Sequence, residues 1–232
     1  MNQIFANYQK VLDSIQFSLE KSGRDKDSVK LLAVTKGQTV ESILELTKLG
    51  QICFSENYVQ EWKQKTETLQ KLSLTQSIKW HFTGRLQTNK VKYLVGAIDL
   101  FHSIDRSELA EKIDQVSKTR NVISRGFVEL NLGDEKSKGG IDLESIEKVL
   151  DRLNRFENLV IVGFMILPPY FDDPELSRPY FKQLREILFD LNRRNLYREE
   201  LTELSMGTSH DFQIAIEEGA TWIRVGRTLF KS

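Results

Sequence analysis

Short apolar runs alternate with amphipathic segments along the whole chain. Apolar residues recur at helical spacing between residues 4 and 19, which predicts an N-terminal helix. The run that begins at Leu31 stops abruptly at Lys36 and Gly37, as is typical of a strand buried on both faces. Seven further runs predict strands, at residues 52–55, 78–82, 99–103, 122–130, 159–167, 203–205 and 222–225.

The segments between these strands have helical periodicity. Thr39 is a candidate N-cap for a helix that Gly50 ends, and Asp105 is a candidate N-cap for a later one. Pro168 and Pro169 end the sixth strand, because proline can continue neither a helix nor a central ladder. The other predicted helices occupy residues 56–72, 86–95, 146–153, 179–195 and 210–218.

Eight strands that alternate with helices predict an α/β fold, namely a (β/α)₈ TIM barrel with an extra N-terminal helix. A doubly wound open sheet is the alternative. We find no linker or low-complexity segment that would split the chain, so residues 1–232 are interpreted as a single domain. Residues 134–140, charged and ended by glycines, are interpreted as a solvated loop.

Composition narrows the possible partners. The 33 basic and 33 acidic residues balance, so the chain has no overall field that would attract nucleic acid or an anionic membrane. Its single cysteine, Cys53, excludes an internal disulfide and is expected to be a buried thiol in a reducing compartment. We expect a cytoplasmic monomer with a small-molecule partner, because no apolar run is long enough to span a membrane and the first residues resemble no targeting signal.

Lys36 is the first candidate for chemistry, because the C-terminal ends of barrel strands carry the ligand site. A lysine at the mouth of a dry core is expected to be partly desolvated, which favours its neutral amine. A neutral amine can attack a carbonyl to form a Schiff base. The alternative is a lysine that simply reaches water where its strand ends.

Two glycine-containing turns follow the last two strands and are candidate phosphate sites. Residues 205–211 place a glycine and three hydroxyls before a helix, and Gly226 supplies a second turn. Backbone N–H groups in such turns attract anions, and barrels commonly bind phosphate after strands seven and eight. The alternative is ordinary N-capping by Ser209 and a tight turn at Gly226. One amine opposite two such turns is a set of groups that suits an aldehyde cofactor with a phosphate.

Residues 80–90, WHFTGRLQTNK, closely resemble the signature of the pyridoxal phosphate homeostasis protein family. Four other segments match that family in order, so that the resemblance spans nearly the whole chain: residues 33–36, 54–61, 205–211 and 224–226. The family is similar to the barrel of the alanine racemase N-terminal domain standing alone. This sequence departs from its pattern at Thr83 and at Arg227 and Thr228.

The resemblance implies that pyridoxal phosphate (PLP) is held as an aldimine on Lys36. It implies that Asn57 and His81 line the pocket and that Arg224 faces the pyridine nitrogen. It also implies that Ser209 and the backbone of Gly226 and Arg227 hold the phosphate. The cofactor-binding residues expected from it are Lys36, Asn57, His81, Met206, Gly207, Ser209, Arg224, Gly226 and Arg227.

Three function classes follow. The first, which the resemblance favours, is a non-catalytic regulator of PLP (vitamin B6) and amino-acid homeostasis that makes transient contact with apo-enzymes needing the cofactor. The second is a PLP-dependent amino-acid racemase, which needs two bases flanking the ring; Tyr58 and Tyr170 are available, but nothing places either there. The third is a barrel enzyme for an unrelated phosphorylated metabolite. His102 is expected to be packed or hydrogen-bonded rather than catalytic, and the sparse histidines and cysteine argue against a metal site.

Overall fold

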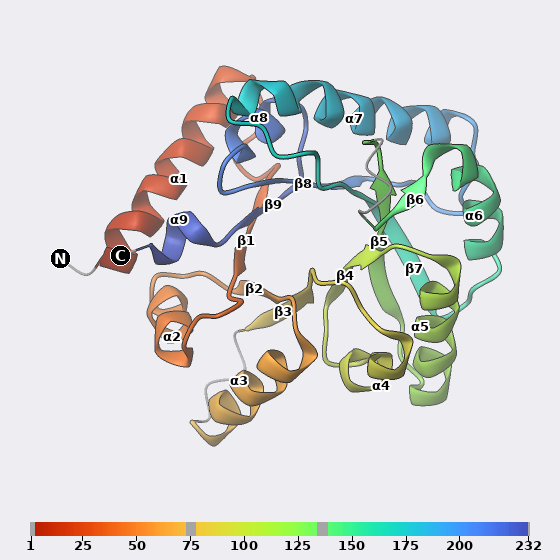
Figure 1. Cartoon of the computed structure of the whole chain (residues 1–232), viewed down its shortest axis with the longest axis horizontal. Coiled ribbons are helices and arrows are strands. Elements are labelled where there is room, and N and C mark those ends of the chain that lie inside the picture. Colours follow the sequence, from red (N-terminus) through yellow and green to blue (C-terminus); the bar gives the residue numbers. More distant parts are fainter. Residues whose placement is uncertain (1–2, 73–77, 134–138, 232) are drawn as a thin grey trace.

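The computed structural model describes residues 3–72, 78–133 and 139–231 and contains a closed parallel barrel (Figure 1). Each barrel strand pairs in parallel with its neighbours, and the β1–β9 and β4–β5 pairings close the ring. Eight strands of the described residues form it: β1 (Lys30–Val34), β2 (Cys53–Glu56), β3 (Lys79–Phe82), β4 (Leu100–Ile104), β5 (Ser124–Asn131), β7 (Leu159–Met165), β8 (Glu203–Thr208) and β9 (Trp222–Val225). The prediction of a TIM barrel is confirmed, and the open-sheet alternative is wrong.

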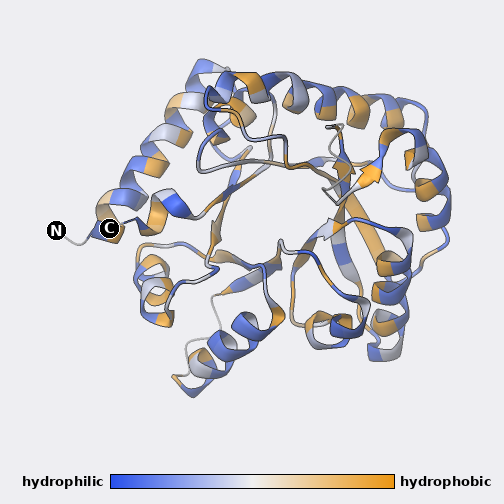
Figure 2. Ribbon diagram, in the orientation of Figure 1, coloured by the Kyte–Doolittle hydropathy of each residue, from blue (hydrophilic) through white to orange (hydrophobic). Residues whose placement is uncertain are grey.

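Helices surround this ring of strands. The α-helices are α1 (Gln3–Lys21), α2 (Val40–Lys48), α3 (Val59–Lys71), α4 (Val91–Leu94), α5 (Ser107–Arg120), α6 (Ile146–Leu153), α7 (Arg178–Arg193), α8 (Phe212–Glu217) and α9 (Arg227–Phe230). Three 3₁₀ turns, η1 (Thr88–Lys90), η2 (Leu143–Ser145) and η3 (Pro174–Ser177), precede α4, α6 and α7. Figure 2 shows hydrophilic residues on the outer face of helices such as α7 and hydrophobic residues along β7. No helix in the described ranges is long and apolar enough to cross a membrane.

The extra N-terminal helix predicted from residues 4–19 is confirmed as α1. It packs on α8 and α9, so that the two chain ends lie close together (Figure 1). The Asn7 side-chain amide donates to the carbonyls of Leu229 and Lys231, at 3.2 and 2.8 Å. The helix therefore ties the last turn of the chain to the barrel.

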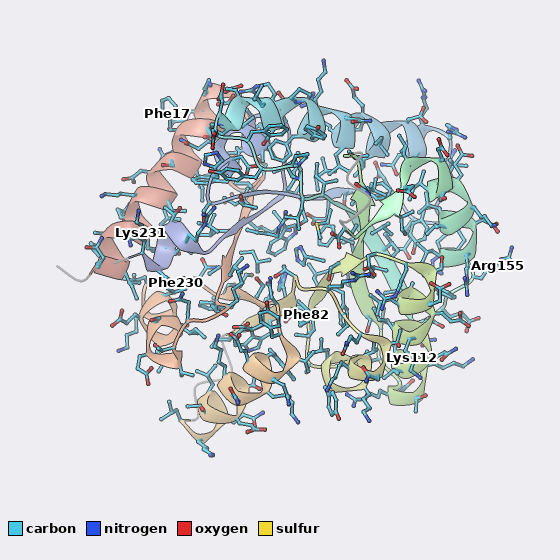
Figure 3. All side chains as sticks on the ribbon, viewed as in Figure 1. Phe17, Phe82, Lys112, Arg155, Phe230 and Lys231 are labelled. Carbon is cyan, nitrogen blue, oxygen red and sulfur yellow. The ribbon has the colours of Figure 1, made fainter. Side chains whose placement is uncertain are left out.

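The core has two layers because side chains alternate along each strand. On β9, Ile223 and Val225 pack into the large cluster between strands and helices, whereas Trp222 joins a smaller cluster inside the barrel. The polar side chains of His102 and Arg224 are also buried inside the ring. Figure 3 shows side chains within the space that the ribbon leaves open, whereas Phe82, labelled at β3, belongs to the large outer cluster.

The structure differs from the sequence-based expectations at three places. Residues 86–95 form only η1 and α4, because Gln87 is still extended. Asp105 does not cap α5: Arg106 occupies the N-cap position, and Asp105 forms an ion pair with it. A short strand, β6 (Ile141–Asp142), pairs with β5 outside the closed ring and was not predicted. Residues 134–138 of the predicted 134–140 loop lie outside the described residues.

Candidate functional site

A cavity of about 320 Å³ opens at the C-terminal ends of the strands. Residues from six strands or from the loops that follow them line it, as expected for the ligand-binding end of a barrel. They are Val34, Lys36, Asn57, Thr83, Met165, Leu167, Thr208, Ser209, Arg224, Gly226 and Arg227. The structure thus brings together Lys36, Asn57, Ser209, Arg224, Gly226 and Arg227 from the predicted set.

Lys36 lies two residues beyond β1, and the residues on both sides of it are anchored. Thr35 donates its N–H to Ser55 O at 2.9 Å, and its hydroxyl donates to Glu56 Oε1 at 2.6 Å. Gly37 has φ +70°, which glycine adopts without strain, and its N–H donates to Glu61 Oε2 at 2.8 Å. The Lys36 side chain itself is exposed, so the desolvation expected from the sequence is not observed.

A buried ion pair supports this anchoring. Lys65, on α3, pairs with Glu56 and donates to the carbonyl of Thr35 at 2.6 Å. The Glu56 side chain is fully buried and the Lys65 side chain nearly so, which makes removal of either partner costly. Lys65 was missed by sequence reasoning, although its position four residues after Glu61 on one helix face gave a signal.

Asn57 is held by the residues that follow β3. Thr83 Oγ1 donates to Asn57 Oδ1 at 2.9 Å, so the departure at Thr83 supplies a bond that an aliphatic side chain would lack. A Cβ at position 84 would lie 2.0 Å from the carbonyl oxygen of Asn57. Gly84 is therefore required for the close approach of these two loops.

Arg224 brings a buried positive charge to the cavity. Its guanidinium donates to Ser205 Oγ at 2.7 Å and to the carbonyl of Ile166 at 2.8 Å, which fixes its orientation. Burial lowers the pKa of Arg224 to about 10, and the charges of Asp211 and Glu129 oppose that shift. The guanidinium therefore remains protonated near neutral pH.

The two turns after β8 and β9 meet at Ser209. Its hydroxyl oxygen accepts from the backbone N–H groups of Gly226 and Thr228, at 3.2 and 3.4 Å. Asp211 fixes the first turn, because its Oδ1 accepts from the N–H and the hydroxyl of Thr208 at 2.7 and 3.0 Å. The N–H groups of Gly226 and Thr228, which lie around the Ser209 hydroxyl, are donors of the kind that bind an anion.

Three of the predicted residues do not line this cavity. His81 faces the barrel interior and lines a second cavity at the opposite end of the strands. Met206 is buried in the outer cluster, since it follows the inward-facing Ser205 on β8. Gly207, with φ +87°, packs against Phe212 and allows α8 to approach β8. The expectation for His102 is confirmed, because it is fully buried and hydrogen-bonded to His81 and Ser205.

Glu129, on β5, is a group near the cavity that sequence reasoning missed. Burial and the charge of Asp105 raise its pKa to about 7, although Arg224 and Arg85 oppose the shift. Carboxylate clusters able to hold a metal are absent from the described residues. Only the folded structure identifies Glu129, because nothing in its strand pattern marks it as titratable near neutral pH.

The folded protein should lose stability as pH rises through the interval between about 4.5 and 7. A raised pKa means that the folded state binds the Glu129 proton more tightly than the unfolded state does. Ionisation of this carboxyl therefore lowers the free energy of unfolding, by roughly 3 kcal/mol at most. Glu129→Gln should remove that part of the slope in urea denaturation measured across this range. The exposed Glu144→Gln is the matched control. An unchanged slope in Glu129→Gln contradicts the assignment.

The chain is similar to known proteins along nearly its whole length. A family model described as alanine racemase, N-terminal domain, matches residues 12–232. A pyridoxal phosphate homeostasis protein of Aquifex aeolicus is 43% identical over 221 residues, which cover 95% of this chain and 94% of that protein.

Solved structures share the fold. PipY of Synechococcus elongatus, solved with PLP bound, is 34% identical with a TM-score of 0.80 and covers 88% of this chain and 92% of its own. A protein of Bifidobacterium adolescentis is 29% identical with a TM-score of 0.89, covering 98% and 94% of the two chains. This chain belongs to the pyridoxal phosphate homeostasis protein family, built on the alanine racemase N-terminal-domain barrel.

Proposed function

We propose that this chain binds PLP in the cavity at the C-terminal ends of the strands and takes part in PLP and amino-acid homeostasis without turning over a substrate. One observation carries the proposal: a single cavity of about 320 Å³ combines an amine, a buried guanidinium and a turn of backbone donors. The relative PipY, solved with PLP bound, supports the same cofactor for this chain.

The residues present fit this cofactor group by group. When bound, PLP supplies an aldehyde that condenses with an amine and a ring that withdraws electrons. Lys36 provides the only amine among the described residues that line the cavity, and it would hold the cofactor covalently through Nζ. Ser209 and the N–H groups of Gly226 and Thr228 would hold the phosphate.

Arg224 would hold the ring nitrogen. Its guanidinium is fixed by Ser205 and Ile166, and it carries a permanent charge into a buried place. A positive charge beside the nitrogen disfavours protonation of the ring, which weakens its capacity to accept electrons. This arrangement favours retention of the cofactor over its use in amino-acid chemistry.

The phosphate assignment predicts that Gly226→Val weakens PLP binding by roughly 10-fold or more. A Cβ at Gly226 would lie 3.0 Å from the carbonyl of Val34 and 3.3 Å from its Cβ, so the turn must shift. The measurement is titration with PLP followed by absorbance, which also tests the proposed function. Gly226→Ala should give a smaller effect, and thermal unfolding of each variant is the control for folding. Wild-type affinity in a folded Gly226→Val protein would place the phosphate elsewhere.

The racemase alternative is favoured only by the shared fold. Racemisation needs a base on each face of the cofactor. Of the described residues that line the cavity, Lys36 alone carries a side chain that can serve as a base, because the guanidinium groups of Arg224 and Arg227 stay protonated. The proposal therefore excludes racemisation at enzymatic rates.

A further inference from the structure

A second cavity, of about 560 Å³, opens at the N-terminal ends of the strands, on the opposite side of the barrel from Lys36. Its volume falls in the range of small-molecule sites. Lys30, Lys79 and Arg125 line it from the starts of β1, β3 and β5, and Asp99 and Glu203 line it from the loop before β4 and the start of β8. We call it the lower cavity.

The charges of the lower cavity are unequal. Lys30 pairs with Glu203 at 3.1 Å. Within the described part of the chain, Lys79 and Arg125 form no ion pair, and Asp99 is the remaining carboxylate of the cavity lining. Three cations against two carboxylates leave one positive charge in excess, which suits a ligand with a single negative charge.

Two residues that line the lower cavity each carry a buried polar atom with no hydrogen-bond partner among the described residues. These atoms are Nε1 of Trp222 and Oε2 of Glu203. Trp222 is only 5% exposed, so its indole N–H is withdrawn from water without compensation. Such a group costs free energy unless a partner arrives. A ligand that offers one acceptor and one donor would satisfy both atoms.

Hydrogen bonds connect the lower cavity to the cofactor cavity through the barrel interior. His81 lines the lower cavity, and its Nδ1 lies 2.9 Å from Nε2 of His102. Nδ1 of His102 lies 2.8 Å from Ser205 Oγ, which accepts from Arg224. We call these four residues the column.

The hydrogen bonds along the column can run in either of two directions. Burial lowers the pKa of His81 to about 3 and that of His102 well below its usual value, so both rings are neutral and each has one donor nitrogen. If Ser205 donates to His102, then His102 donates to His81, which leaves Nε2–H of His81 as a donor. In the other direction Nε2 of His81 is an acceptor. A ligand that hydrogen-bonds to Nε2 of His81 therefore fixes the direction of the hydrogen bonds along the column. That direction decides whether the Ser205 hydroxyl, which accepts from Arg224, also donates to His102 or accepts from it.

We propose that the lower cavity is a second ligand site, for a small monoanionic heteroaromatic molecule, and that the column carries its occupancy to Arg224. Ligand binding in the lower cavity does not depend on the proposed function, whereas the effect of that ligand on PLP affinity rests on the proposed function. The carboxylate of the ligand would lie between Lys79 and Arg125, and a ring acceptor would take the N–H of Trp222.

The binding test uses 5-hydroxynicotinate as the probe and calorimetry on PLP-free protein. It should bind with a Kd below about 1 mM, and benzoate, which lacks the ring acceptor and the donor, should bind roughly fivefold more weakly. Trp222→Phe keeps the ring but removes the N–H, and it should weaken the probe roughly 3- to 10-fold. Lys79→Gln should weaken it similarly, whereas the exposed Lys92→Gln should not.

Absence of probe binding up to about 10 mM, or binding that both Trp222→Phe and Lys79→Gln leave unchanged, would overturn the site. Simple displacement of the probe by PLP would do the same, because it would place the probe in the cofactor cavity. Lys79 is exposed, so Lys79→Gln decides the matter even if Trp222→Phe does not fold.

The column is tested separately by imidazole ¹⁵N NMR of the PLP-free protein. Probe binding should shift the ring signals of His102, which does not line the lower cavity. In protein that binds PLP, saturating probe should change PLP affinity about fivefold, and Ser205→Ala should abolish that change while the probe still binds. Unshifted His102 signals would overturn the column, and failure of PLP to bind would count against the proposed function alone.

Discussion

Lys36→Ala should abolish covalent attachment of PLP while the protein stays folded. Lys36 provides the only amine among the described residues of the cavity lining, and its side chain is exposed, so its removal leaves no core packing defect. The wild-type protein should be yellow, with an imine absorbance band that Lys36→Ala lacks. After borohydride reduction, peptide mass spectrometry should find the cofactor on Lys36.

Lys92→Ala is the matched control, because this exposed lysine lies on α4, outside the barrel ring. It should keep the absorbance band and the label on Lys36. A second control is residual affinity: Lys36→Ala should still bind PLP weakly through the turns at Ser209 and Gly226. Label on another lysine, with Lys36 unmodified in the wild-type protein, would refute the assignment.

Much of the barrel was predictable because parallel strands buried on both faces give continuous apolar runs. The run at residues 222–225 coincides with β9, and the helix at residues 146–153 coincides with α6. β6 has two residues, too few for a periodic signal. Residues 86–95 have apolar positions that suggest a helix, yet the extended Gln87 delays the helical turns until Thr88.

The cofactor cavity was predictable where a residue follows a strand, and less so within one. Lys36, Ser209 and Gly226 come after strand ends, which meet at one mouth of the barrel. Met206 and His81 lie within strands, where the side-chain face decides the location. Family resemblance placed both at the cofactor, but alternation directs Met206 outward, and His81 lies nearer the other end of the barrel.

The supporting contacts could not be derived from sequence spacing. Lys65 reaches Thr35 across 30 positions, and His102 reaches Ser205 across 103. Such pairs depend on the register of neighbouring strands and on which face of a helix turns inward. The exposure of a side chain could not be derived from the sequence either. Lys36, at the end of a strand, was expected to be desolvated, whereas the loop directs it toward solvent.

Holo-protein should exchange the α-proton of L-alanine and form D-alanine far more slowly than a racemase. The described cavity lining offers one base, Lys36, and the two tyrosines considered as the opposing base are unsuited to that role. Tyr58 and Tyr170 are 60% and 69% exposed, and Tyr170 stacks on His210 rather than lining the cofactor cavity. Lack of a positioned acid or base typically costs about 10²- to 10⁴-fold in rate.

The measurement is incubation of holo-protein with L-alanine and other amino acids in deuterated water, with α-proton exchange followed by NMR and D-isomers by chiral chromatography. Arg224 alone does not decide the outcome, because an arginine at the ring nitrogen weakens electron withdrawal without preventing it. Slow racemisation is expected because the described cavity lining offers no second base beside Lys36. Lys36→Ala, mixed with the same amount of PLP, gives the background rate from free cofactor. Turnover at roughly 1 s⁻¹ or faster that disappears in Lys36→Ala would contradict the proposed regulator and show that the protein is a racemase.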